Sequence, residues 1–195
     1  MPNQDTTTTP SATGGAASPE LEAARDGYQQ LLDGFLTVQL ATADAEGNPE
    51  ASYAPAVMDA NRDFYLQASE LAKHLWNLRA TPRASVLIIE DEGGCETIFA
   101  RRRVSFDCEV VEIERHSEEW ERGTALLETR HGKMAGHLKG MADFHLFRLR
   151  PLGGRLVLGF GKAYDVGGAR MDELSHIGAG NGGGHRRERG GKEAR

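Results

Sequence analysis

The sequence has little cysteine and no long apolar segment. Its two cysteines, Cys95 and Cys108, form no CxxC pair, so we expect neither a cysteine-based metal site nor a redox pair. This cysteine usage is typical of the reducing cytoplasm. Cys108 falls in a strand pattern, and we expect it to pack as a small hydrophobic residue. No apolar run approaches the roughly 18 residues that span a membrane, and the first residues lack the charged start and apolar core of a secretory signal. The sequence therefore predicts a cytoplasmic protein without a membrane partner.

Positive charge is also scarce over most of the chain. The 23 lysine and arginine residues are outnumbered by 29 aspartate and glutamate residues, which gives a net charge of −6. General nucleic-acid binding requires a basic face, so we expect no nucleic-acid partner. The exception is the end of the chain, where a group of basic side chains is typical of a solvated tail: Arg186, Arg187, Arg189, Lys192 and Arg195.

Both ends of the chain lack the apolar bulk of a packed domain. Residues 1–17 are rich in Thr, Ala, Gly and Pro, and we expect a disordered amino-terminal tail there. Near the other end, the segment HIGAGNGGGH, residues 176–185, is half glycine. At 195 residues the chain suits one domain plus tails. We therefore predict a single domain over residues 18–166 and a flexible Gly/His/Arg-rich arm over residues 167–195.

The stretch LTVQLATADAEGNPEASYAPAV, residues 36–57, has the pattern of two strands joined by a turn. Leu36, Val38 and Leu40 alternate with polar or small residues, as in a half-buried strand. The polar link over residues 44–49 contains a glycine and a proline, which are typical of turns and strand entrances. The small residues that follow allow a neighbouring backbone or a flat ligand to approach closely. We expect this hairpin to seed an antiparallel barrel.

Further strands and helices alternate along the rest of the domain. Apolar alternation or short branched runs predict five more strands, over residues 64–68, 84–89, 101–113, 144–149 and 155–160. Capping residues and helical spacing predict helices that begin at Ser18, Ser69 and Ser117, with a short one over residues 133–141. Strands dominate the middle of the chain. This order favours a mostly β, antiparallel barrel with peripheral helices over a wound parallel sheet.

Three arginines stand at the start of the long predicted strand. Alternation places Arg101 and Arg103 on one face of that strand and Arg102 on the other. Two guanidinium groups on one face could bind carboxylates or phosphates in a bidentate manner. The alternative is an edge strand that charge protects against pairing with other chains. Both interpretations stay open from the residues alone.

A second candidate site is the helix that Ser69 is predicted to cap. The first N–H groups and the dipole of a helix attract anions, and Lys73 in the first turn would add a positive charge. The alternative is an ordinary amphipathic helix on the protein surface. A phosphate-bearing ligand is therefore one hypothesis for this helix.

Histidines form the third candidate group. His131, His137 and His145 lie near the last predicted helices, and His176 and His185 lie on the predicted arm. No HxxxH or HExxH spacing occurs, so we expect no mononuclear metal site built from protein ligands alone. A histidine on a glycine-rich arm can instead fill an open coordination position of haem iron. The other histidines are interpreted as surface or structural residues.

Several segments together resemble the haem-utilisation HugZ/HutZ family: LATADAEGNPEASYAPAV, SELAKHLWNLRATPRASVLIIED, FARRRVSFDCEV, RHGKMAGHLKGMADFHLFRLRP and GRLVLGFGKAY, followed by a terminal H…GH. They span residues 36–185 in the expected order, and GFGKAY with the following H…GH is the most specific part. The resemblance implies an FMN-binding-type split β-barrel, as in pyridoxamine-phosphate oxidases, that forms a homodimer.

The resemblance also implies a function and site residues. It implies haem binding and oxidative haem degradation, in which the ring opens, iron is released and an external electron donor supplies electrons. His185 matches the axial ligand of the haem iron, and His176 is the second choice because the arm is richer in glycine than expected of the family. Asp143 matches a catalytic aspartate near the ligand that can come from the other subunit. Arg103 or Arg102 matches a basic residue near a haem propionate.

Two alternatives remain open at this point. In the first, the protein is an FMN-dependent oxidoreductase of the same fold, with Ser69, Lys73 and nearby arginines at the FMN phosphate. A complete phosphate-binding set cannot be mapped onto the chain. In the second, the protein is a haem carrier without catalytic activity. Whether the ring is opened depends on the geometry of the haem pocket, which no motif in the sequence encodes.

Overall fold

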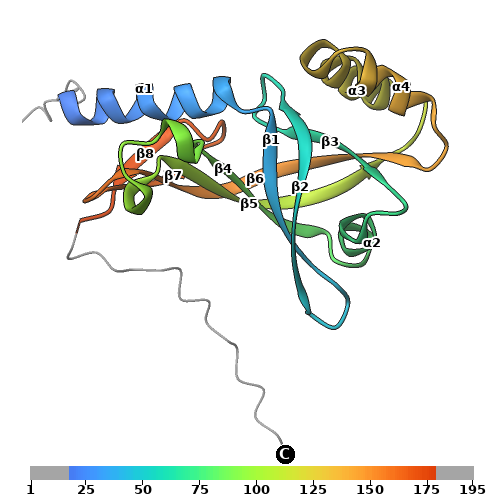
Figure 1. The fold of residues 1–195 in the computed structure, drawn as a ribbon, viewed down its shortest axis with the longest axis horizontal. Coiled ribbons are helices and arrows are strands. Elements are labelled where there is room, and N and C mark those ends of the chain that lie inside the picture. Colours follow the sequence, from blue (N-terminus) through green and yellow to red (C-terminus); the bar gives the residue numbers. More distant parts are fainter. Residues whose placement is uncertain (1–17, 179–195) are drawn as a thin grey trace, which may run out of the picture.

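The computed structural model describes residues 18–178. Helix α1 (Pro19–Gly34) begins as the sequence predicts, because the Ser18 side chain accepts a hydrogen bond from the Leu21 backbone N–H at 3.3 Å. It lies along one end of the sheet (Figure 1). The carboxyl end of a helix is stabilised by a positive charge, but the last turn of α1 contains no basic residue. Arg130 supplies this charge by donating to the carbonyl oxygens of Asp33 and Phe35 at 2.7 and 2.6 Å.

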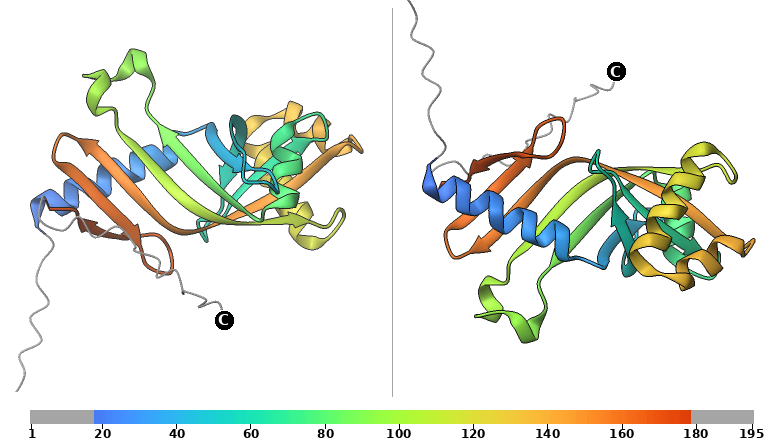
Figure 2. Two further views of the ribbon diagram at one scale, coloured as in Figure 1. Left: turned by 90° about the horizontal axis from the view of Figure 1, so that it is seen from below. Right: turned by 90° about the horizontal axis from the view of Figure 1, so that it is seen from above.

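The described strands form one antiparallel sheet: β1 (Thr37–Ala43), β2 (Pro49–Met58), β3 (Phe64–Ser69), β4 (Arg83–Ile89), β5 (Arg103–Ile113), β6 (Phe144–Gly159), β7 (Lys162–Gly167) and β8 (Glu173–His176). Their order is β3-β2-β1-β4-β5-β6-β7-β8, and β3 also pairs with β6. That pairing closes the first six strands into a barrel, while β7 and β8 extend the sheet beneath α1 (Figure 2). The predicted antiparallel barrel with peripheral helices is confirmed.

Strand β6 connects the two ends of the molecule. The sequence predicts two strands, over residues 144–149 and 155–160, but the structure contains one continuous strand of 16 residues. The first part of β6 pairs with β3 and with the end of β5, and the last part pairs with the start of β5 and with β7. Gly154 permits this arrangement, because an added Cβ would lie only 2.6 Å from the carbonyl oxygen of Ser105 on β5.

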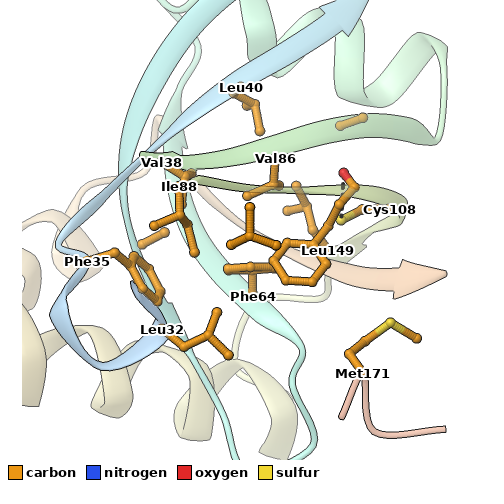
Figure 3. Close-up of a cluster of buried hydrophobic side chains, with 14 of the residues drawn as sticks. Leu32, Phe35, Val38, Leu40, Phe64, Val86, Ile88, Cys108, Leu149 and Met171 are labelled. Atoms are coloured by element: carbon orange, nitrogen blue, oxygen red, sulfur yellow. Dashed lines mark hydrogen bonds between the residues drawn. The ribbon is translucent and has the colours of Figure 1, made fainter. Parts of the chain in front are cut away.

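The core fills the barrel interior. Phe64, Phe106 and Phe147 are fully buried, and the Phe64 and Phe106 ring centroids lie 5.6 Å apart. Cys108 packs among these apolar side chains, as the sequence predicts for a small hydrophobic residue, and burial raises the pKa of its thiol to about 12 (Figure 3). A second apolar cluster fixes the α3–α4 helices: Tyr65, Ile113, Trp120, Leu127, Ala135 and Leu146.

The remaining helices lie at the barrel end opposite α1: α2 (Lys73–Ala80), α3 (Glu118–His131) and α4 (Lys133–Gly140). Ser117 caps α3 by accepting from the Trp120 N–H at 3.1 Å, which confirms that prediction. The predicted cap at Ser69 is wrong. Ser69 is the last residue of β3, and α2 begins later, after Ala72, without a capping side chain. None of the described helices has the length and apolarity that a membrane crossing requires.

The end of the domain also differs from the expectation. The predicted boundary at residue 167 falls inside the sheet, because β8 returns antiparallel to β7 and pairs His176 with Tyr164. His176 therefore occupies a strand end, whereas the sequence placed it on the arm. The predicted tail over residues 1–17 and the part of the arm that contains His185 lie outside the described residues. Between β4 and β5, the loop contains two short 3₁₀ helices, Glu92–Gly94 and Ile98–Ala100.

Candidate functional site

A cavity of about 870 Å³ lies between α1, the β6–β7 turn and β8. We call it the α1 cavity. Its wall includes apolar groups of α1 and β6, two basic side chains, two acidic side chains of α1 (Glu20 and Asp26) and one histidine. The residues that matter below are Ala23, Arg102, Leu158, Phe160, Lys162 and His176. The structure thus brings together two residues that the sequence nominated separately, Arg102 and His176.

The motif GFGKAY forms the rim of the α1 cavity. The chain reverses between Gly159 at the end of β6 and Lys162 at the start of β7. Gly161 has φ of 70°, a left-handed conformation that favours glycine. The turn leaves Phe160 75% exposed at the cavity. The sequence did not nominate Phe160 or Lys162 as site residues, although the two glycines of the motif were the signal that could have found them.

His176 is fixed to this turn. Its Nε2 lies 3.0 Å from the carbonyl oxygen of Gly161, and its ring packs edge-on against Tyr164 with centroids 5.2 Å apart. A carbonyl oxygen only accepts, so Nε2 carries the proton of this bond. In the neutral ring, Nδ1 then keeps a lone pair and can accept a hydrogen bond or bind a metal ion.

Arg102 connects the cavity wall to the β4–β5 loop. Its Nε donates to Glu90 Oε2 at 2.7 Å, its backbone N–H to Glu90 Oε1 at 2.8 Å, and its Nη1 to Gln30 Oε1 at 3.0 Å. Burial opposes the ionisation of Glu90, but the hydrogen bonds and charge of Arg102 outweigh it and lower the pKa of this carboxyl. Arg102 is therefore held in one orientation by groups on α1 and on the loop.

The other two arginines of the run serve the loop backbone. Strand β5 begins at Arg103, so strand alternation does not apply to Arg101. The Arg101 guanidinium donates to the Glu90 carbonyl and to Glu92 at 3.1 Å. Arg103 Nη1 donates to the carbonyl of Arg101 at 2.9 Å. The pair of guanidinium groups expected on one strand face is not formed.

Asp143 lies at the opposite end of β6. The hydroxyl of Ser69 is 3.2 Å from Asp143 Oδ2, and the Glu70 N–H donates to the Asp143 carbonyl at 2.9 Å. Leu156, which pairs with the cavity residue Tyr164, lies much farther along the strand. At about 3.3 Å per residue, roughly 40 Å of strand separates Asp143 from Leu156. One protomer therefore does not bring Asp143 to its own α1 cavity.

The α2 region contains the residues considered for a phosphate. Lys73 begins α2, and His74 beside it is half-buried, with its pKa lowered mainly by burial. The buried Asn77 donates to Thr42 Oγ1 at 3.0 Å and to Glu50 Oε2 at 2.8 Å, which fixes the helix to the β1–β2 hairpin. Within residues 18–178, no cluster of three or more His, Cys, Asp or Glu side chains is arranged to hold a metal ion.

Comparison with known proteins assigns the class of fold first. Residues 24–158 match the family model described as pyridoxamine 5'-phosphate oxidase. Together with the closed six-stranded antiparallel barrel, this match identifies the chain as a split barrel of that class. The predicted fold class, mostly β with an FMN-binding-type split barrel, is confirmed.

The relatives within this class are more specific. The chain is 40% identical over 141 residues, 72% of this chain and 80% of the relative, to a Vibrio cholerae serotype O1 protein named haem oxygenase HutZ. A solved structure of HutZ, described as the haem storage protein from Vibrio cholerae, has a TM-score of 0.63 and 36% identity and covers 73% of this chain and 96% of that one. Campylobacter jejuni ChuZ has a TM-score of 0.73 and 28% identity, with coverages of 82% and 64%. The chain belongs to the HugZ/HutZ family.

Proposed function

We propose that this protein binds haem and degrades it oxidatively, opening the ring and releasing iron with electrons from an external donor. The observation that carries the proposal is the 40% identity, over 141 residues, to the protein named haem oxygenase HutZ. The description of HutZ as a haem storage protein supports a second candidate, a haem carrier without catalytic activity. The two cysteines form no disulfide, which is consistent with a protein that functions in the reducing cytoplasm.

The α1 cavity supports haem as the ligand. Its volume of about 870 Å³ lies within the usual range of small-molecule sites. Haem is a flat apolar ring with two propionate carboxylates. Leu158 and Phe160 offer apolar contacts to such a ring, and Arg102 and Lys162 offer positive charge to the propionates. In this proposal Arg102 takes the propionate role that the resemblance assigned to Arg103 or Arg102.

The axial ligand of the iron is proposed to be His185, with His176 as the second choice. Asp143 is proposed to accept a hydrogen bond from the ring nitrogen of the ligand histidine that faces away from the iron. Such a bond fixes the tautomer of a metal-bound histidine and raises its basicity. If His176 is instead the ligand, Nδ1 would bind the iron, and Nε2, which donates to the Gly161 carbonyl, would have to give up that bond in order to donate to Asp143.

The separation along β6 supports a site shared by two copies. Asp143 precedes the first residue of β6, a strand of 16 residues, and the α1 cavity lies at the other end of that strand. Both can act on one haem only if Asp143 comes from a second copy of the chain. The proposed homodimer therefore places the α1 cavity of one protomer against the Asp143 end of its partner.

The chain's own residues have three roles in this proposal. Arg102 and Lys162 orient the ligand through its propionates, the cavity wall excludes water from one face of the ring, and Asp143 tunes the ligand histidine or delivers protons. Bound haem supplies the iron chemistry and is also the substrate that is oxidised. The protein contributes position, axial ligation and electrostatics.

The test is a hemin titration of the purified protein, followed by ascorbate in air. We expect a Soret band that forms and then decays. A band that persists would favour the carrier. His185→Ala should abolish or sharply weaken the band, whereas His176→Ala should leave it; the reverse result would make His176 the ligand, and an unchanged spectrum in both variants would contradict histidine ligation from this part of the chain.

FMN is the alternative cofactor that the fold class suggests. In that hypothesis Ser69, Lys73 and nearby arginines bind the phosphate. Ser69 does not favour it, because its hydroxyl already bonds Asp143 and the Leu71 N–H, each at 3.2 Å. An FMN titration that yields a yellow protein, with no Soret band after hemin addition, would support the flavin oxidoreductase and contradict haem degradation.

A further inference from the structure

The segment that follows β3 holds Asp143 by both its main chain and its side chain. Ser69, the last residue of β3, pairs with Phe144, the first residue of β6. The Glu70 N–H donates to the Asp143 carbonyl at 2.9 Å, and the Ser69 hydroxyl lies 3.2 Å from Asp143 Oδ2. This contact joins residues that are 74 positions apart in the sequence, and it exists because β3 and β6 close the barrel.

The direction of the Ser69 hydrogen bonds is fixed by chemistry. The Leu71 N–H can only donate, and it lies 3.2 Å from the Ser69 hydroxyl oxygen. A hydroxyl has one proton, which is then available to Asp143 Oδ2, and an ionised carboxylate can only accept it. The second oxygen, Asp143 Oδ1, makes no hydrogen bond or ion pair within residues 18–178. One carboxylate oxygen is therefore tied to Ser69, and the other is available to a further donor.

The Ser69 segment, residues 69–72, is itself anchored by neighbouring side chains. Trp76 Nε1 donates to the Glu70 carbonyl at 2.8 Å, and the Glu70 carboxylate lies 3.1 Å from His145 Nε2. The Ala72 N–H donates to the Ser69 carbonyl at 2.8 Å. Because these contacts come from both α2 and β6, the hydroxyl of Ser69 is held in place independently of any ligand. Such fixed supporting contacts are what orient a functional carboxylate.

We infer that Ser69 is a positioning residue of the proposed haem site, which orients Asp143 so that Oδ1 meets the N–H of the ligand histidine from the second copy. This inference rests on the proposed function. The bond to Oδ2 restrains rotation of the carboxylate. Oδ1 is therefore held in the orientation that gives the stronger hydrogen bond to the ligand histidine. Without it, the ligand histidine loses part of the hydrogen bond that sets its basicity.

The experiment is a double-mutant cycle with Ser69→Ala and Asp143→Ala in the full-length protein. Hemin affinity is measured from the Soret band, and the midpoint potential of the bound haem by spectroelectrochemistry. We expect Asp143→Ala to weaken hemin binding about tenfold and Ser69→Ala about threefold, with potential shifts in the same direction. In the Asp143→Ala background, where the acceptor is gone, Ser69→Ala should change neither quantity further. Ser69→Thr keeps the hydroxyl and should restore both to the wild-type values.

A control and a haem-free measurement separate this inference from its alternatives. Ser117→Ala removes a different serine hydrogen bond, the α3 cap, and should lower Tm without changing the potential. In the haem-free protein, the Tm losses of Ser69→Ala and Asp143→Ala should be less than additive, because each removes one partner of the same bond; additive losses would contradict the bond. If Asp143→Ala shifts the potential and Ser69→Ala does not, this inference fails while the proposed function stands. A wild-type protein without a Soret band overturns both.

Discussion

The two ends of β6 are built differently. At the end near α1, the sheet is extended by β7 and β8, a cavity of about 870 Å³ opens, and Phe160 is 75% exposed at its rim. At the other end, polar side chains are joined in a network. Arg79 Nη2 lies 2.7 Å from Glu112 Oε1, and both residues contact His145, which reaches Glu70 on its other nitrogen.

The two ends of β6 thus meet different requirements: one end has space for a ligand, and the other holds a carboxylate in a fixed position. A ligand site needs unfilled space and groups that can change partners, which the α1 cavity provides through Phe160 and Lys162. A carboxylate that must act at a fixed position needs neighbours that hold it in one orientation, as Ser69 and Glu70 hold Asp143. The fold separates these two demands by the length of one strand, and dimerisation as proposed would bring them together.

The largest expected effect comes from breaking the strand that joins the two ends. Gly154→Ala places a Cβ 2.6 Å from the Ser105 carbonyl oxygen, a backbone atom that cannot move aside. We expect a loss of about 3 kcal/mol in the free energy of unfolding, measured by urea denaturation. Gly153→Ala is the matched control, because its nearest neighbour is 3.9 Å away, and should cost about 0.5 kcal/mol or less. Equal losses in both variants would contradict the packing explanation.

A smaller effect, on hemin affinity, is expected when a bulky side chain fills the α1 cavity. Ala23→Trp projects an indole from α1 into the α1 cavity and should weaken hemin binding about thirtyfold by occupying the space that the ligand needs, close to 2 kcal/mol. Glu22→Trp adds the same side chain at an exposed position outside the cavity wall and should bind hemin normally. Normal binding by both variants, in a Soret titration, would place the haem elsewhere on the protein.

A side chain that links the two ends should have an intermediate effect on stability. Arg130 of α3 donates to the carbonyl oxygens of Asp33 and Phe35 at the end of α1. Arg130→Met should cost about 1 kcal/mol, because the last turn of α1 has no basic residue of its own. Hydrogen exchange should rise in the last turn of α1 more than in β7. A uniform rise over the whole chain would mean that Arg130 stabilises the domain without a specific role at α1.

Local features of this fold were predictable from the sequence. Ser18 and Ser117 cap helices because a serine before a helical apolar pattern can satisfy the first free N–H groups without help from distant residues. The β1–β2 hairpin follows from strand alternation around a polar turn. Cys108 is buried as expected, since it falls on the apolar face of its strand.

Features that depend on distant pairing were not predictable in the same way. Ser69 is a residue type that commonly caps helices, and a helical pattern follows it. Barrel closure nevertheless extends β3 to this residue and directs its hydroxyl to Asp143. His176 belongs to a glycine-rich segment, yet pairing with β7 makes it a strand residue. Arg102 and His176 meet at one cavity because a loop and a returning strand converge on α1, which no local pattern encodes.

The smallest effect is expected from breaking one ion pair at each end of β6 and measuring how the change in Tm depends on pH. The hydrogen bonds and charge of Arg79 lower the pKa of Glu112. A carboxyl whose folded-state pKa is lowered stabilises the protein above its unfolded value, about 4.3, and this contribution disappears as the pH falls through the folded value. Arg79→Met should therefore lower Tm by about 2 °C at pH 7 and progressively less below pH 4. Arg155→Met breaks an isolated pair with Asp165, whose side chains are 55% and 58% exposed, and should leave Tm unchanged at either pH. A deficit in Arg79→Met that is constant with pH would instead reflect lost packing on Trp76, whose ring lies 5.2 Å from the guanidinium.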